Sequence, residues 1–314
     1  MQRRRPLLSA GCAIALLAST MAHAGAGGSP VAPAGAALRT ASDGGAVVRT
    51  LARDGSIVTV RGTAAGRDGR GSVSVSMKTV RPKTGHDASA YARAGRSVVG
   101  DLVALGMAPA EARRQFGDLE TLSVPAGSSV TRTPSTAPTT GGSGAVTPYD
   151  TQCAAINVGD GKITGYGCAS FYLVRRDGTD WWLHTKMKVS AHSSDESWFY
   201  PKRLTQLGWR VTWAGGNVLY DWDPYSTRPV GECVTLTVKS SSPFGEVSVQ
   251  GNICPESLGP WAVTTGRSGG IWNGLERGTD YEGALATQAV HSPPGAPVSF
   301  QSAWTLSYCD LWCI

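Results

Sequence analysis

The chain has 314 residues, of which 41% are hydrophobic and 17% are charged, and it contains 40 glycines and 18 prolines. This much glycine and proline with so little charge argues against a coiled coil, a helical bundle and a charged disordered chain. It favours a turn-rich β protein. No run of 18 apolar residues follows the N-terminal segment, so we expect no membrane span.

The first 24 residues have the pattern of an export signal. Arg3, Arg4 and Arg5 form a positive start, an apolar stretch follows over residues 7–18, and Ala22-His23-Ala24 is a small-x-small cleavage site. We therefore expect residues 1–24 to be a signal peptide and the mature protein to be secreted. The adjacent arginines leave both the general secretory route and the twin-arginine route open.

Charge is distributed unevenly along the mature chain. Residues 25–144 carry 14 basic and 8 acidic side chains, whereas residues 145–314 carry 12 basic and 15 acidic ones. Outside the cell, a basic region is more suited to anionic envelope polymers than to nucleic acid. We expect an extracellular glycan or protein ligand as the partner, and no nucleic acid.

Composition divides the mature chain into three parts. Residues 25–123 predict a small α+β unit, with short strands over residues 45–82, a helix over 88–105 and a second helix that begins at Pro109 and ends at Gly117. This unit would be a pro-region or an envelope-binding module. Residues 124–147 have the Ser/Thr/Pro/Gly composition of a linker. Residues 148–314 contain every tryptophan and all six cysteines of the mature protein.

Two cysteine pairs lie where hairpin geometry brings them together. A two-residue turn at Asp160-Gly161 places Cys153 directly opposite Cys168. Pairing Cys233 with Cys254 puts the reversal at Pro243-Phe244, inside a Ser/Pro/Gly cluster. An even number of cysteines in an exported chain indicates disulfides. No pair has the C-x-x-C spacing of a zinc or redox site.

Cys309 and Cys313 are the two cysteines that remain, so we predict that they form the third disulfide.

A third hairpin is predicted around Gly215-Gly216. Its apolar pairs would be Trp209 with Trp222, Val211 with Tyr220, and Trp213 with Val218. On the other side of this hairpin Arg210 would meet Asp221. With further alternating strands up to residue 308 and no helical pattern after residue 150, the C-terminal domain is predicted to be an all-β antiparallel sandwich or barrel, stapled by disulfides.

Ten tryptophans lie between Trp181 and Trp312. Indole rings suit stacking on sugars or gripping a peptide, although most tryptophans fill cores. Trp181 and Trp182 are adjacent, so on a strand they point to opposite faces. One of these two, together with Trp261 or Trp272 in glycine-rich stretches, is the predicted exposed binding platform.

The segment Gly266-Arg267-Ser268-Gly269-Gly270 resembles the nucleophile loop of chymotrypsin-type serine proteases. In that family the chain order is histidine, aspartate, serine. The resemblance implies catalytic roles for His192, for Asp221 or Asp223, and for Ser268, with residues 25–144 as the pro-region.

Other chemistry has weaker support in the sequence. Calcium could be bound by the carboxylates of Asp221 and Asp223, or by those of Asp195 and Glu196. The sequence has no EF-hand loop, and we expect no metal and no cofactor. Glycoside hydrolases use a pair of carboxylates, and the spacing of the acidic residues in this sequence does not single out any such pair.

The preferred hypothesis is a secreted, non-catalytic β-sandwich that binds a polysaccharide or another extracellular or envelope ligand. A secreted serine hydrolase is the alternative, and an inhibitor or structural envelope protein is a third.

Overall fold

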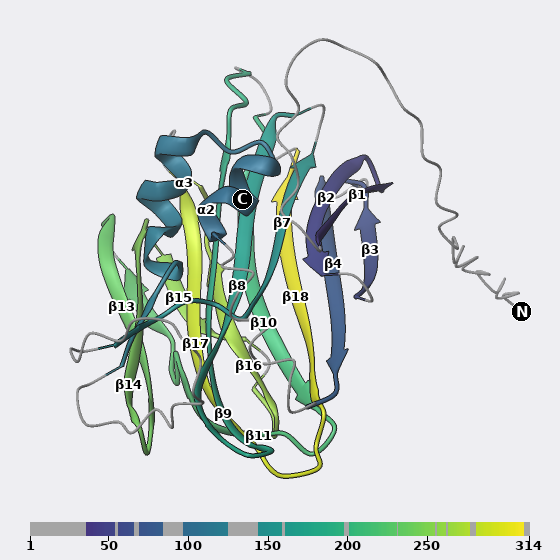
Figure 1. Cartoon of the computed structure of the whole chain (residues 1–314). Coiled ribbons are helices and arrows are strands. Elements are labelled where there is room, and N and C mark those ends of the chain that lie inside the picture. The colour runs from purple at the N-terminus through teal and green to yellow at the C-terminus, as the bar shows by residue number, and fades with distance from the viewer. Residues whose placement is uncertain are drawn as a thin grey trace, which may run out of the picture. The chain divides into compact units, whose positions relative to one another are not determined.

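The described residues form two seven-stranded antiparallel sheets in the computed structural model (Figure 1). The structure describes residues 36–53, 56–65, 69–83, 97–124, 144–158, 161–197, 201–230, 232–254, 256–261, 263–276 and 281–310. The predicted signal peptide, most of the predicted linker and the first part of the predicted 88–105 helix lie outside these ranges. The sandwich prediction for the C-terminal half is confirmed.

The first sheet, sheet A, has the strand order β1-β2-β7-β8-β9-β17-β11. Its strands in chain order are β1 (Ala36–Asp43), β2 (Ala46–Arg53), β7 (Asp150–Val158), β8 (Ile163–Asp177), β9 (Asp180–Ser193), β11 (Val218–Asp223) and β17 (Glu282–Ser292).

The second sheet, sheet B, has the order β12-β15-β16-β10-β18-β4-β3. Its strands are β3 (Ile57–Thr63), β4 (Arg70–Arg81), β10 (Arg203–Ala214), β12 (Arg228–Val230), β15 (Glu256–Pro260), β16 (Arg267–Asn273) and β18 (Val298–Cys309).

The core lies between the inner faces of the two sheets. Trp209 on β10 stacks on Trp304 on β18, with ring centroids 5.7 Å apart. Phe171 on β8 stacks on Phe300 on β18 across the interface, at 3.9 Å. All four rings are buried, so large aromatic side chains fill much of the space between the sheets.

The N-terminal strands belong to the same two sheets as the C-terminal strands. β2 pairs with β7 in sheet A, and β4 pairs with β18 in sheet B along its whole length. The strands expected over residues 45–82 are present, but they do not form a separate sheet. The physical reason is that β7 and β18 each have an open edge, and a hairpin from the N-terminal segment satisfies the backbone groups of each edge.

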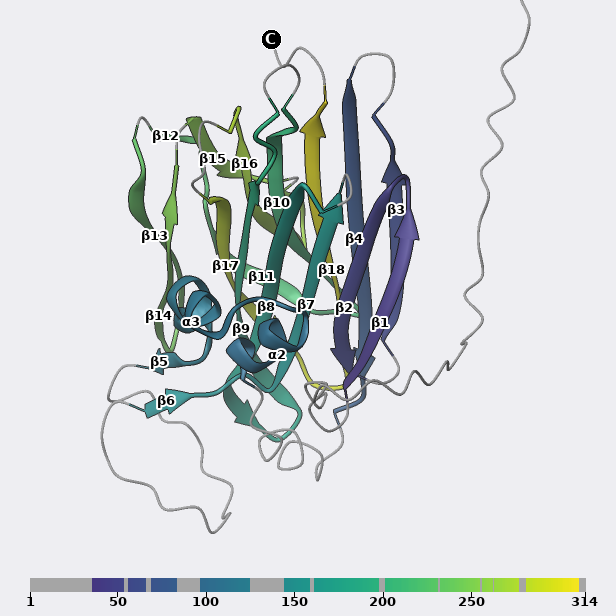
Figure 2. The same ribbon diagram turned by 90° about the horizontal axis from the view of Figure 1, so that it is seen from above.

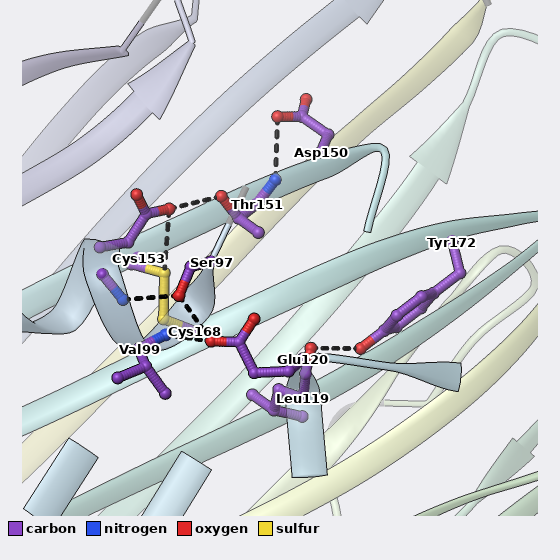
Figure 3. The surroundings of a disulfide bond; sticks show 11 residues. Ser97, Val99, Leu119, Glu120, Asp150, Thr151, Cys153, Cys168 and Tyr172 are labelled. Atoms are coloured by element: carbon purple, nitrogen blue, oxygen red, sulfur yellow. Dashed lines mark hydrogen bonds between the residues drawn. A yellow bond between two sulfur atoms is a disulfide. The ribbon is translucent and has the colours of Figure 1, made fainter. Parts of the chain in front are cut away.

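Two helices and a disulfide lie on the outer face of sheet A. The helices are α2 (Val98–Ala104) and α3 (Pro109–Phe116), followed by the 3-10 turn η1 (Gly117–Leu119). The Ser97 hydroxyl caps α2 by accepting from the Gly100 amide at 3.0 Å, and Glu120 accepts from the Val99 amide at 2.7 Å. Figure 3 shows this cap beside the Cys153–Cys168 disulfide. The Thr151 hydroxyl of β7 donates to Asp101 of α2, and the Tyr172 hydroxyl of β8 donates to the Leu119 carbonyl of η1, so these two bonds hold the helical segment against the sheet.

Two short two-stranded sheets complete the described structure. One pairs β5 (Leu122–Val124) with β6 (Gly144–Val146). The other is a ribbon of β13 (Val234–Ser242) and β14 (Gly245–Ile253), closed by the Cys233–Cys254 disulfide. Both predicted disulfides and the reversal at residues 243–244 are confirmed.

The ribbon docks on sheet A through two carboxylates of β11. Asp223 accepts from the Lys239 amide at 2.8 Å, and Asp221 accepts from the Ser241 amide and hydroxyl. Both aspartates project from the same side of β11, because residues two apart share a face. The amides of residues 239 and 241 share one edge of β13 for the same reason, so the two spacings match.

The third predicted hairpin is wrong. The chain reverses at Gly215-Gly216, and both glycines have positive φ, but the flanking strands do not pair. β10 bonds to β16 and β18 in sheet B, whereas β11 bonds to β17 in sheet A. The glycines therefore carry the chain from one sheet to the other, and Arg210 and Asp221 end on different sheets. Both edges of β10 are occupied by other strands, which leaves no edge for β11.

Cys309 is disulfide-bonded, and Cys313, its predicted partner, lies outside the described residues. Within those residues, every helix is too short or too polar to cross a bilayer.

Candidate binding face on sheet B

The outer face of sheet B carries small polar and basic side chains. Figure 2 shows α2, α3 and the β13–β14 ribbon on the side of sheet A, with the strands of sheet B on the other side. Alternation along β3, β4, β10 and β18 turns large apolar side chains inward and leaves polar ones outside. We call the resulting surface the basic face. Its residues are Thr59, Arg61, Ser74, Ser76, Lys78, Arg210, Thr212, Trp261, Arg267, Gln301, Ala303 and Thr305, all at least partly exposed.

Sheet B has a strong excess of positive charge. Its strands contain eight basic residues and one acidic residue, Glu256, at the start of β15. The basic residues are Arg61, Arg70, Lys78, Arg81, Arg203, Arg210, Arg228 and Arg267. The strands of sheet A, in contrast, contain seven basic and seven acidic residues. The excess is therefore a property of one sheet and not of the protein as a whole.

Trp261 lies on the basic face beside two arginines. Its ring rests on Gly208 of β10, where an added Cβ would be 3.1 Å from the indole. Its amide donates to the Gly269 carbonyl at 2.8 Å, which fixes the indole next to β16. The Arg210 guanidinium lies 4.5 Å from the ring centroid, a cation–π arrangement. Glycine at position 208 thus makes room for the ring.

Arg210 and Arg267 are close enough to repel each other. Arg210 pairs with Gly269 across β10 and β16, so Arg267 is its diagonal neighbour, with Cβ atoms about 7–8 Å apart. Burial, and then the positive charge of Arg267, lower the pKa of Arg210. Two like charges held together on this face give it a locally positive potential.

A straight row of side chains joins the two ends of the face. Lys78 pairs with Gln301, Gln301 with Thr212, and Thr212 with Arg267. Because neighbouring strands are about 4.8 Å apart, Lys78 and Arg267 are separated by about 14 Å, with an amide and a hydroxyl between them. Such a row can bind an extended ligand that has negative charges and hydroxyl groups.

No family model matches the chain, and no curated protein matches it in sequence. Its function is therefore inferred from these side chains and from the positions of the residues predicted above.

Three of the four predicted platform tryptophans lie elsewhere. Trp272 is fully buried, and its indole nitrogen donates to the Cys254 carbonyl. Trp181 is 4% exposed. Trp182 faces the outer side of sheet A, stacked on His291 and in edge contact with Tyr220 and Phe244. The expected exposed platform therefore does not include Trp181 or Trp272, and among the four only Trp261 lies on the basic face.

The residues implied by the protease resemblance do not come together. Ser268 is 1% exposed, and its hydroxyl accepts from Gln288 between the sheets at 2.8 Å. Gln288 is in register with Thr185 on β9, and His192 lies seven residues further along that strand. At about 3.3 Å per residue, His192 is therefore about 23 Å from Ser268.

Asp221 and Asp223, the two candidate aspartates of that triad, already have structural partners. They lie on the outer side of sheet A, where they hold β13, and Asp223 forms a salt bridge with Arg228 at 2.9 Å. Residues 267–270 are part of strand β16, and Gly266 lies in the turn just before it. An added Cβ would be 2.2 Å from a backbone oxygen at Gly269 and again at Gly270, so these glycines permit close packing of backbones.

Three of the four acidic residues considered for calcium, Asp195, Asp221 and Asp223, have structural partners. Asp195 accepts from the amides of Ser197 and Lys202 and so closes its own loop. Among the described residues no three His, Cys, Asp or Glu side chains are grouped to hold a metal ion.

Sequence reasoning missed the cations of the basic face. The signal was present in the strands themselves, since β4, β10, β16 and β18 contain arginine, lysine, serine and threonine but no acidic residue. Placing them on one surface requires the strand order of sheet B. That order joins residues more than 200 positions apart.

Proposed function

We propose that this protein is an exported, non-catalytic binding module whose basic face holds an acidic polysaccharide of the cell envelope or extracellular space. The observation that carries the proposal is the charge of the basic face, whose twelve residues include four basic ones, Arg61, Lys78, Arg210 and Arg267, and no acidic one. A polymer with repeated carboxylate or phosphate groups is complementary to such a face.

The neutral side chains of the face favour a carbohydrate. Serine, threonine and glutamine offer both donors and acceptors to sugar hydroxyls, and Trp261 offers part of an aromatic ring. Their side chains are short, so an extended chain can lie across several strands. The disulfides fit an oxidising compartment, in agreement with the expected signal peptide.

The serine hydrolase alternative has less support. Among the described residues, no histidine or aspartate lies at the Ser268 hydroxyl, which is buried and bonded to Gln288. Removal of residues 25–144 as a pro-region would also break the backbone hydrogen bonds between β2 and β7 and between β4 and β18. We therefore expect secreted material to begin near Gly25, and N-terminal sequencing tests this. A mature start within residues 124–147 would favour a zymogen.

A binding assay tests the proposal. The mature chain should be retained on acidic polysaccharides such as polygalacturonate and alginate, and not on cellulose or dextran. Retention should weaken as salt increases, because exposed charges are screened. Arg210→Gln with Arg267→Gln should weaken binding about tenfold, at about 0.7 kcal/mol for each exposed charge contact.

The matched control removes two exposed charges from the sheet A side, by Arg113→Gln with Lys162→Gln. This double variant has the same net charge as the basic-face variant and should bind like the wild type. Equal loss in both variants would mean that only net charge matters, and retention on neutral glycans alone would refute the proposal.

A further inference from the structure

A polar groove lies on the opposite side of the sandwich from the basic face. It is bounded by α3, by β14 of the ribbon and by the start of β17, on the outer face of sheet A (Figure 2). Its volume is about 690 Å³, within the range of small-molecule sites. We call it the α3 groove. Its lining includes Arg114, Gln115, Lys188, Ser190, Asn252 and Tyr281.

Glycines keep the groove open next to the sheet. At Gly251 an added Cβ would be 2.9 Å from the Lys188 side chain, and at Gly283 it would be 2.9 Å from the Val189 carbonyl. These positions allow the ribbon and α3 to approach sheet A while leaving space between them. The groove is thus bounded by rigid elements and by the Cys233–Cys254 disulfide.

The charges at the groove neutralise one another. Lys188 donates to Asp118 at 3.2 Å and to the Gln250 carbonyl at 2.7 Å. Arg114 donates to both carboxylate oxygens of Glu111, at 2.9 and 2.5 Å. Hydrogen bonding from Arg114 is the main cause of the lowered pKa of Glu111. Two basic and two acidic groups cancel, so the groove attracts neither anions nor cations, unlike the basic face.

Polar groups without partners remain at the groove. Gln115 is 8% exposed, and its amide nitrogen donates to Glu111. Its amide oxygen has no hydrogen-bond partner among the described residues. An unsatisfied buried acceptor is costly, and a hydroxyl donor from a ligand would remove that cost.

One lining residue of the groove, Tyr281, forms an aromatic pair with His192, which is not itself part of the lining. His192 packs against Tyr281, with ring centroids 4.3 Å apart, and its Nδ1 lacks a partner within the described part of the chain. Burial lowers the pKa of His192, so the ring is neutral at pH 7 and has one donor and one acceptor nitrogen. Tyr281 adds an aromatic surface and a hydroxyl.

We infer that the α3 groove is a second binding site, and that its ligand is a neutral saccharide of one or a few residues. The groove offers amides, hydroxyls and the aromatic ring of Tyr281 without net charge, which matches a hydroxyl-rich neutral molecule. The inference is independent of the proposed function, because it depends on other residues on the other sheet. With both sites occupied, the protein would bridge an acidic polymer and a neutral glycan.

Calorimetric titration of the mature chain with neutral cello-, xylo-, manno- and chito-oligosaccharides tests this inference. We expect at least one series to bind. Gln115→Met keeps the side-chain volume, removes the amide and should weaken binding about tenfold, the value of one well-formed hydrogen bond in a buried site. Tyr281→Ala should weaken it to a similar extent, and Tyr281→Phe less.

The controls separate this site from the basic face. Arg210→Gln with Arg267→Gln should leave neutral-sugar binding unchanged, and loss of binding in this variant would overturn the inference. So would a failure of every neutral series to bind at millimolar concentration. Binding that is unchanged in both Gln115→Met and Tyr281→Ala, with melting curves showing folded variants, would place the sugar elsewhere and also overturn it.

Discussion

Gln288 is the polar link between the two sheets, and its replacement gives a measurable test of the fold. The residue is fully buried on β17. Its amide nitrogen donates to the Ser268 carbonyl and hydroxyl, each at 2.8 Å, and to the Val211 carbonyl at 3.1 Å. Its amide oxygen accepts from the Trp213 indole at 2.9 Å. One side chain of sheet A therefore satisfies three residues of sheet B.

Gln288→Met keeps a similar volume and removes every one of these hydrogen bonds. It leaves the Trp213 indole nitrogen and the Ser268 hydroxyl buried without their partner, and each such group costs about 1–3 kcal/mol. We expect a loss of about 3 kcal/mol in the free energy of unfolding. For a domain of this size the melting temperature should fall by about 6–12 °C.

Urea unfolding followed by tryptophan fluorescence measures this loss, and a double-mutant cycle identifies its cause. Trp213→Phe removes the indole donor, so Gln288→Met should cost about 1–2 kcal/mol less in that background than in the wild type. A single-variant loss below about 0.5 kcal/mol, or strict additivity in the cycle, would show that the two sheets do not meet through Gln288.

Three further predictions concern stability. Replacing Cys153 and Cys168 together by serine should lower the free energy of unfolding by about 3 kcal/mol, because the disulfide no longer restricts a loop of about 15 residues in the unfolded chain. Equal urea midpoints for the oxidised protein and this variant would contradict the prediction. An alanine Cβ at Gly269 would be 2.2 Å from a backbone oxygen of β10, so Gly269→Ala should lower the free energy of unfolding by more than about 3 kcal/mol. Gly161 has open space around it but a positive φ, so Gly161→Ala should lower the free energy of unfolding by only about 1 kcal/mol. Burial raises the pKa of Glu276 to about 7, so the native carboxyl keeps a proton that the unfolded chain releases. Stability should therefore fall between about pH 4.5 and pH 7, by at most about 3 kcal/mol, and curves that run parallel in the wild type and Glu276→Gln from pH 4 to 8 would refute this assignment.

Local signals in the sequence predicted the local parts of the fold. The turn at Asp160-Gly161 and the positions of Cys153 and Cys168 both follow from two-residue hairpin geometry, and the register is as expected. The same reasoning succeeded for the β13–β14 ribbon. It also placed the second helix correctly, because Pro109 is suited to the first turn of a helix.

Non-local pairing could not be predicted in this way. Gly215-Gly216 has the composition of a hairpin turn, yet the same glycines also permit an arch between two sheets, and the outcome depends on which strands compete for the edges of β10. Arg210 therefore lies beside Trp261 and not beside Asp221, its predicted partner. The candidate site was predicted only in part, through Trp261, because strand order decides which cations share a face.

The way the N-terminal strands are incorporated has a practical consequence for handling this protein. A protease that cuts between Val124 and Gly144 would nick the chain without dissociating it, because two seams of backbone hydrogen bonds, β2–β7 and β4–β18, would still join the pieces. The larger fragment made alone would present two bare strand edges to other copies of itself and would tend to polymerise. Co-expression of the smaller fragment should rescue it, so the chain is suited to use as a split, self-assembling pair.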